Sequence, residues 1–405
     1  MAIIGSSVDH TIETYPERTI CLNNNRTFSL YLFYALNFLA VGMTTFAAKF
    51  YGEIGLSDSQ IGIISALAAF IALFAQPMWG MLADRMHYMR TALVIGLVCA
   101  GFTCFLVLPA SGSFLPLLAV LTLYSTFYLP AMPVSNAIAI EYTSKHNLPF
   151  GPIRMTGTIG YQISILITGF LLAGSLMPLY PLLGVILIIA GLSARLMPPI
   201  HGEQHRDAPV SLSIFLKDPA LLLLFLLAFL ASIGHQFNLS FFSKFLGDLG
   251  MDNTTTGIIS TLSVVFEVPF LLFGDRIARR FTIWTWMSIG LAVGAVRFLL
   301  LSVVHSPALI IITQSLSIAH LACFEFIPFI YLGRRTRKEL LSSVQSLYTT
   351  ITFGLSRIIG TLFGGFIADT AGIAQVYRYC GLILLAALII FYIPMRRTAA
   401  LERQK

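Results

Sequence analysis

The sequence predicts an all-α membrane protein with twelve transmembrane helices in two pseudo-symmetric six-helix bundles. Of the 405 residues, 57% are apolar and only 11% are charged, whereas soluble domains carry about a quarter charged residues. Long apolar stretches recur along the whole chain, and about 20 apolar residues suffice for a helix that crosses a bilayer. One hydrophilic interruption, residues 199–217, divides the chain near its middle.

The apolar runs define the expected elements in chain order. Because they are continuous rather than alternating, they favour helices over a membrane β-barrel. The first six spans are 27–52, 57–82, 91–110, 114–140, 148–173 and 178–198. The second six are 219–246, 253–274, 282–303, 308–331, 340–367 and 373–394. The predicted domains are an N-terminal tail (1–26), an N-terminal bundle (27–198), a central linker (199–217), a C-terminal bundle (218–394) and a C-terminal tail (395–405).

The distribution of Lys and Arg predicts the orientation. With the N-terminus inside, 19 of the 25 basic residues fall in the tails, the linker and the loops on the inner side. By the positive-inside rule both termini, and the linker, are expected to be cytoplasmic in the cell inner membrane. The net charge of +7 is therefore a topology signal, and no nucleic-acid partner is expected. The first 26 residues lack a basic start followed by an apolar core, so no signal peptide is expected.

An internal repeat supports two related halves. Residues 49–67 and residues 244–262, 195 positions later, agree at nine of nineteen positions without a gap. Each segment covers a helix end, a short outer loop and the start of the returning helix. Ser57 with Gln60 fits a capping box, and Asp252 or Asn253 could cap the equivalent helix. The five cysteines show neither disulfide nor metal spacing and are expected to be buried apolar side chains.

The first inner loop contains Gly80, Asp84, Arg85 and Arg90. A glycine, an acid–base pair and a basic residue at this place resemble the signature loop of the major facilitator superfamily, the MFS fold. The resemblance implies a conformational latch, in which the acid faces the N-terminus of helix eleven while the inner side is closed. A carboxylate is favoured at the positive end of a helix. The alternative interpretation is a positive-inside anchor.

Ionisable side chains within predicted helices are functional candidates, because a charge in the hydrocarbon core costs several kcal/mol. The acids are Glu267 and Glu325, with Glu141 near a helix end, and the basic side chains are Arg154, Arg297, Arg357, His235 and His320. For any single residue, pairing that only holds helices together is the alternative. As a set they predict a polar cavity.

Arg154 lies in the stretch from Phe150 to Tyr161, FGPIRMTGTIGY. This stretch resembles helix five of lactose-permease-like proton symporters and of their phenylpropionate and nucleoside relatives. The resemblance implies that Arg154 binds substrate and that Tyr161 stacks on it. Asn136 stands where family members carry a substrate-binding acid, so Arg154 keeps a free positive charge. An anionic substrate is then plausible, because arginine binds carboxylates with two hydrogen bonds.

The C-terminal half resembles the aromatic-acid branch of the same clan. His235 falls where helix seven of that branch has a histidine, and Gln236 and Asn238 follow it. The resemblance implies substrate binding by these three residues.

Proton coupling is expected further along this half. Glu267 matches the helix-eight acid of that branch, Arg297 the helix-nine arginine and His320 the helix-ten histidine. Glu325 follows His320 by five positions rather than three, so in an α-helix it is expected to point to a different side. The proton role is therefore divided between Glu267 and Glu325.

The resemblance implies a transporter rather than an enzyme. The expected activity is proton-coupled symport of a small organic solute, such as an aromatic or other organic acid, a saccharide or a nucleoside, by alternating access. The expected partners are this substrate, protons and the lipid bilayer, for a monomer without cofactors that uses the proton gradient. A proton-antiport efflux transporter of the same fold is the alternative. A receptor or an intramembrane enzyme is a remote alternative, and no ATP-binding loop is present in the sequence.

Overall fold

The computed structural model describes residues 25–201, 218–265, 280–336 and 338–403, and every regular element in these ranges is helical. The N-terminal half consists of α1 (Asn25–Met43), η1 (Thr44–Phe46), α2 (Ala47–Glu53), α3 (Asp58–Arg85), α4 (Met89–Phe105), α5 (Val107–Ala110), α6 (Phe114–Tyr128), α7 (Ala131–Lys145), α8 (Gly151–Leu171), α9 (Leu179–Ser193) and η2 (Ala194–Leu196). The predicted all-α membrane fold is confirmed, since nine segments of the described chain are long and apolar enough to cross a membrane. The number twelve stays a prediction.

The C-terminal half begins at α11. It consists of α11 (Pro219–Asp248), α12 (Asn253–Val265), α14 (Ile283–Leu301), α15 (Pro307–Ser315), α16 (Ser317–His320), η3 (Leu321–Phe326), α17 (Ile327–Arg335), α18 (Lys338–Thr349), η4 (Thr350–Leu355), α19 (Ser356–Ala371) and α20 (Ile373–Arg403). Both η3 and η4 are π-helical. The predicted proton site Glu267 lies outside the described residues.

The repeated segments adopt the same local structure. Ser57 and Gln60 form the predicted capping box at the start of α3, and the Asp252 carboxylate accepts a 2.8 Å hydrogen bond from the Thr255 amide at the start of α12. The hydrogen bonds from Thr255 hold the pKa of Asp252 below its usual range. The matching glycines Gly55 and Gly250 have φ angles of 85° and 81°. Only glycine adopts this left-handed conformation without strain, which explains why both copies keep it.

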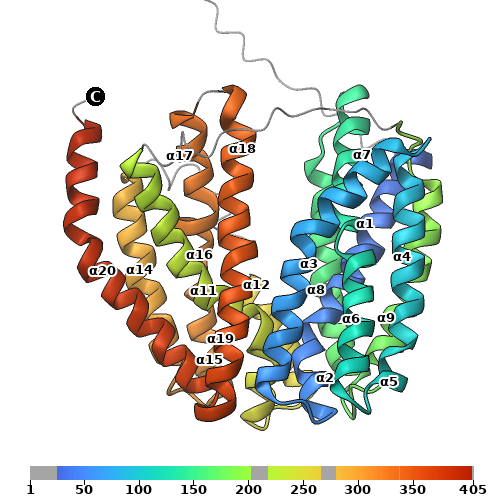
Figure 1. The fold of residues 1–405 in the computed structure, drawn as a ribbon, viewed down its shortest axis with the longest axis horizontal. Helices are drawn as coiled ribbons and strands as arrows, with labels where there is room; N and C mark the ends of the chain where they lie inside the picture. The colour runs from blue at the N-terminus through green and yellow to red at the C-terminus, as the bar shows by residue number, and fades with distance from the viewer. Residues whose placement is uncertain (1–24, 202–217, 266–279, 337, 404–405) are drawn as a thin grey trace, which may run out of the picture.

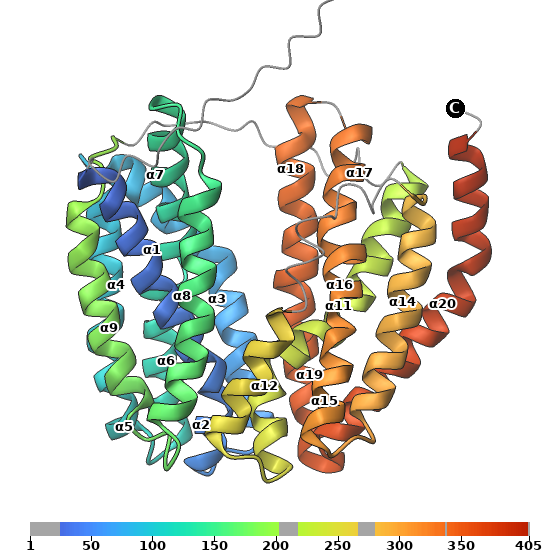
Figure 2. The same cartoon turned by 180° about the vertical axis from the view of Figure 1, so that it is seen from behind.

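The two halves pair their helices in the same order (Figures 1 and 2). In the N-terminal half α1 packs against α8 and α4 against α9. In the C-terminal half α11 packs against α19 and α14 against α20. Counting the connected segments as single helices, each pair in one half corresponds to the pair six helices later. The pairing of the helices therefore follows the internal repeat of the sequence.

Two of the helix crossings between the halves are contacts between glycines. Gly62 of α3 meets Gly365 of α19, where a methyl group on Gly62 would lie 2.4 Å from the backbone oxygen of Thr361. Gly169 of α8 meets Gly257 of α12 in the equivalent way. Small residues let helix backbones approach closely within a membrane. Gly62 and Gly257 occupy matching positions of the repeat.

The repeated lysines reach across to the opposite half. The Nζ of Lys49 donates to the backbone oxygen of Met251 at 2.7 Å. The Nζ of Lys244 lies 3.1 Å from the Oδ1 of Asp58. Asp369 of α19 accepts hydrogen bonds from the amide of Asp58 (3.0 Å) and the hydroxyl of Ser59. We call Lys49, Lys244, Asp58 and Asp369 the interhalf clamp, because they join the halves at the end where the repeat loops lie.

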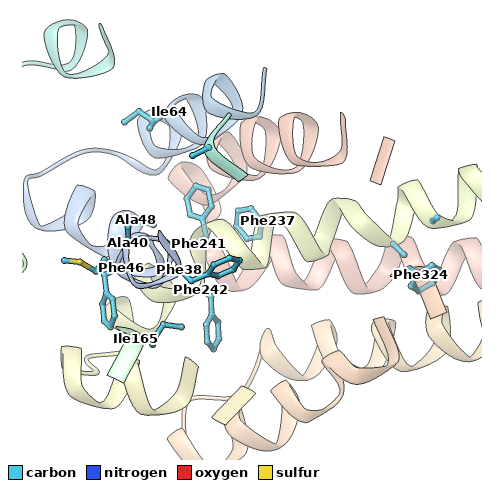
Figure 3. Packing of buried hydrophobic residues seen from close by; sticks show 14 of the residues in the cluster. Phe38, Ala40, Phe46, Ala48, Ile64, Ile165, Phe237, Phe241, Phe242 and Phe324 are labelled. Atoms are coloured by element: carbon cyan, nitrogen blue, oxygen red, sulfur yellow. The ribbon is translucent and has the colours of Figure 1, made fainter. Parts of the chain in front are cut away.

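The halves diverge toward the opposite end. Figure 1 shows them meeting near α2 and α12, whereas α7 and α18 stand apart at the end where α1 begins and α20 ends. Figure 3 shows buried phenylalanines of α11 and of the α1–η1 segment gathered where α11 packs against η1 and α2. The molecule is thus closed at the clamp end.

Candidate functional site

Three predicted residues of the C-terminal half come together in one cluster. His235 of α11 and His320 of α16 stack with ring centroids 3.8 Å apart and an interplanar angle of 10°. The Oε1 of Glu325, in η3, lies 3.8 Å from the Nε2 of His235 and 3.7 Å from the Nε2 of His320. Both histidine side chains are largely buried, and the Glu325 side chain is 25% exposed. We call these three residues the histidine–glutamate cluster.

The expectation that Glu325 and His320 point to different sides of their helix is wrong. The segment between them is a π-helix, in which hydrogen bonds join residues five apart, so a residue and its fifth successor lie one above the other. Pro328 accounts for the irregularity, because it cannot donate to the carbonyl four residues earlier, that of Phe324. The Tyr348 hydroxyl donates to that carbonyl instead, at 2.6 Å.

The cluster offers ligand types that could hold a metal ion. Its two imidazole nitrogens and one carboxylate oxygen lie within 4.8 Å of one another. Neighbouring ligand atoms of a tetrahedral zinc site lie about 3.3 Å apart, which is shorter than the observed 3.7 and 3.8 Å. The two parallel rings present their Nε2 atoms side by side to the carboxylate. The same side chains can also exchange protons, so the cluster is a candidate for either role.

The other predicted residues of this half have partners outside the cluster, and only Arg297 also interacts with it. Arg297 of α14 donates to the Gln314 side chain at 2.6 Å and interacts electrostatically with both histidines. Gln236 donates to the Thr352 backbone oxygen at 3.3 Å, and Asn238 accepts from the Tyr377 hydroxyl at 3.0 Å. Gln236 and Asn238 are 3% and 4% exposed. Their hydrogen bonds join helices, so the geometry favours packing over substrate binding, which stays a prediction.

Arg154 lies in a second cluster, formed by the N-terminal half. Its guanidinium carbon is 4.4 Å from the centre of the Phe38 ring, and its Nη1 is buried without a hydrogen-bond partner in the described structure. Tyr34 stacks on Phe38 and donates to the Oδ1 of Asn136 at 2.7 Å. Arg154 also stands in the first turn of α8, where the helix dipole already attracts anions. The structure therefore brings Arg154 and Asn136 into one neighbourhood.

Tyr34 and Phe38 are functional candidates that the sequence did not single out. They are four residues apart on α1 and so share one face of it, which is a weak signal in a chain with 32 Phe and 15 Tyr. The Tyr161 hydroxyl lies 3.3 Å from the Thr45 hydroxyl. Its stacking on a substrate stays a prediction.

The predicted latch residues lie at the diverging end. Helix α3 ends with Asp84 and Arg85, and Gly80 lies shortly before them. Arg90 donates to the backbone oxygens of Arg195 and Met197 in its own half. Among the described residues, no ion pair joins Asp84 or Arg85 to the C-terminal half. The role of these residues as a latch stays a prediction.

Two helical halves that pair in the same order around buried ionisable side chains are the architecture of a membrane transporter. Residues 27–379 match the MFS_1 like family, and the chain belongs to that family. It is 25% identical over 363 residues to the uncharacterized transporter YwbF of Bacillus subtilis, covering 87% of this chain and 90% of that protein. It is also 25% identical to the maltose permease of Geobacillus stearothermophilus, covering 92% and 96%.

A solved structure has the same fold. The nucleoside transporter NupG superposes with a TM-score of 0.81 at 19% identity, covering 92% of this chain and 99% of that chain. The predicted major facilitator fold is confirmed, and the chain is a multi-pass membrane transporter rather than an enzyme.

Proposed function

We propose that this transporter couples the uptake of a small organic solute to proton entry by alternating access. The observation that carries the proposal is the histidine–glutamate cluster, a carboxylate held beside two buried imidazoles within the C-terminal half. Acids and histidines at membrane depth are typical of proton relays, because their cost in the bilayer is retained only for function. Aromatic and other organic acids, saccharides and nucleosides are the candidate substrates.

The geometry supports a proton step that depends on conformation. The distances of 3.7 and 3.8 Å from Glu325 to the two imidazoles are about 1 Å longer than a hydrogen bond. A small movement of η3 or α11 would therefore make or break proton exchange between them. A protonated, neutral Glu325 removes the cost of a charged carboxylate during the movement of the halves.

The N-terminal half supplies a candidate substrate site. Arg154, with the aromatic rings of Phe38 and Tyr34 and the amide of Asn136, offers a cation, stacking surfaces and hydrogen-bonding groups in one place. The maltose permease and the nucleoside transporter are named for neutral solutes. An anionic substrate is therefore a proposal that rests on the residues of this chain.

The orientation completes the proposal. With the termini in the cytoplasm of a cell with an inner membrane, the clamp end faces outward and the diverging end faces the cytoplasm. The conformation then corresponds to the inward-facing state, in which a symporter releases solute and proton.

Transport in proteoliposomes tests the proposal. Purified protein is reconstituted and offered labelled aromatic acids, oligosaccharides and nucleosides with an acidic exterior. Protein-free liposomes correct for passive entry of weak acids. A symporter accumulates at least one solute, and a protonophore abolishes the accumulation. An acidic exterior that instead empties vesicles preloaded with solute identifies the antiporter, and accumulation that ignores the protonophore contradicts proton coupling.

A further inference from the structure

A cavity of about 310 Å³ lies between the two halves. From the N-terminal half it is lined by residues of α3 and by Leu129, which follows α6. From the C-terminal half it is lined by the end of α18, by η4 and by Arg357 of α19. Small-molecule sites are typically 300–1,000 Å³ and often lie between domains. We call this space the interhalf cavity.

Arg357 is the one basic residue in the lining of the interhalf cavity. It lies near the middle of the continuous α18–η4–α19 segment, which runs from Lys338 to Ala371. Its Nε is buried without a hydrogen-bond partner in the described structure. No acid whose side chain is described forms an ion pair with it. A charged arginine at this depth costs several kcal/mol unless something pairs with it.

The remaining walls of the interhalf cavity are mostly apolar. Ala68 and Ala72 of α3 are small and leave room, while Leu73 and Phe353 present larger apolar surfaces. Polar groups are few and lie on both sides, for example Gln76 of α3. A single cation in an apolar space bordered by both halves suits a ligand with one acidic group and an apolar body.

The backbone beside Arg357 is irregular. The π-helical segment η4 ends at Leu355, and the Ser356 hydroxyl donates to the backbone oxygen of Ile351, five residues earlier, at 2.8 Å. Such π-helical segments within α-helices are frequent at functional sites. The irregularity therefore lies at the same wall as Arg357, for which the described residues supply no ion-pair partner.

We propose that Arg357 binds the acidic group of the transported solute in the interhalf cavity, and that the solute is a small organic anion with an apolar body. This inference rests on the proposed transport of an organic solute. Arginine presents a planar fork that binds a carboxylate with two hydrogen bonds. The bound acidic group neutralises the charge of Arg357. Because the interhalf cavity is lined by both halves, the bound ligand touches both of them. The loaded carrier therefore moves its halves without an unpaired buried cation.

Cysteine reactivity tests the charge in the interhalf cavity without knowledge of the substrate. Ala72→Cys is introduced into the full chain after replacement of its five cysteines. Its reaction rates are measured with the anionic 2-sulfonatoethyl and the cationic 2-(trimethylammonium)ethyl methanethiosulfonates. An unpaired Arg357 attracts the anionic reagent, so Arg357→Gln should lower the anion-to-cation rate ratio about tenfold. Arg357→Lys should preserve most of the ratio. Arg334→Gln, which removes an exposed cation outside the cavity, should leave it unchanged.

Protection of the same cysteine tests the solute class. Benzoate and hexanoate should slow the reaction with a neutral methanethiosulfonate, and their matched carboxamides should not. Arg357→Gln should abolish the protection. Protection by the carboxamides, or protection that survives Arg357→Gln, overturns the inference. An anion-to-cation rate ratio that is unchanged in Arg357→Gln also overturns it. A complete lack of protection by benzoate and hexanoate does the same. If sodium sulfate protects the cysteine to the same degree as benzoate and hexanoate, the site binds an inorganic anion. That result would overturn the inference that the solute is organic.

The outcomes distinguish this inference from the proposed function. The reactivity ratio and the protection need no proton gradient, so they can succeed even where accumulation fails to depend on the gradient. Gradient-driven uptake of a neutral solute with unaltered kinetics in Arg357→Gln would support the symporter and overturn the role of Arg357.

Discussion

The interhalf clamp should hold the clamp end closed, and Asp58→Asn tests this. The Asp58 carboxylate lies 3.1 Å from the Lys244 Nζ, and both side chains are less than 15% exposed. At an effective dielectric constant of about 20 the attraction is about 5 kcal/mol. Desolvation of the two charges offsets most of this attraction, and Lys244 keeps its pair with Asp248. We therefore expect Asp58→Asn to destabilise the closed clamp end by about 1–2 kcal/mol relative to the open one. The ratio of molecules open at the clamp end to molecules closed there should rise about 5- to 30-fold.

Distance measurement between spin labels reports that ratio. Labels at Ser113→Cys and Ser306→Cys place one probe in an exposed loop of each half, outside the helix crossings. Double electron–electron resonance should show a longer-distance population that grows in Asp58→Asn. Asp248→Asn is the matched control, because it removes the pair within α11 and leaves the pair between the halves. Equal distance distributions in Asp58→Asn and the unaltered chain would refute the clamp.

Two further substitutions test the helix crossing and the N-terminal cluster. Gly62→Ala should disfavour the state that is closed at the clamp end and reduce transport strongly, because its methyl group would lie 2.4 Å from the Thr361 oxygen. Gly112→Ala, where nothing lies within 4 Å, should transport normally, and normal transport by both variants would contradict the close crossing. Arg154→Lys keeps the charge but loses the planar fork, so solute affinity should fall about tenfold or more. Near-normal affinity in an equilibrium binding assay would remove Arg154 from the substrate site.

The repeat was the most informative part of the sequence. It predicted equivalent outer loops, and the structure gives them equal left-handed glycines, helix caps at Ser57 and Asp252, and lysines that cross reciprocally between the halves. The glycine turns and the helix caps are local, so matching residues are enough to predict them, whereas the lysine contacts join distant segments and had to be seen in the structure. The all-α membrane fold followed from the length of the apolar runs, because bilayer thickness sets helix length.

The site was less predictable, because it depends on contacts between distant helices. A regular helical period places Glu325 away from His320, and only the π-helical segment before Pro328 brings them together. The sequence contains Pro328 but does not show that Tyr348, twenty residues later, replaces the missing donor to Phe324. Arg357 was visible as a buried cation, yet its cavity requires α3 of the other half. The contact of Gln236 with the backbone of η4 likewise joins segments that are far apart in the sequence.

We propose that Glu325 carries the coupling proton, and the Glu325→Gln variant tests this role most directly. Glutamine keeps the shape of a protonated carboxyl group but can neither take up nor release a proton. Exchange of labelled for unlabelled solute across the membrane should therefore persist at near-normal rates, while accumulation driven by a pH gradient should vanish. His146→Gln, on the loop after α7 and outside the cluster, is the control and should accumulate normally. Accumulation of solute against its gradient by Glu325→Gln would contradict the account.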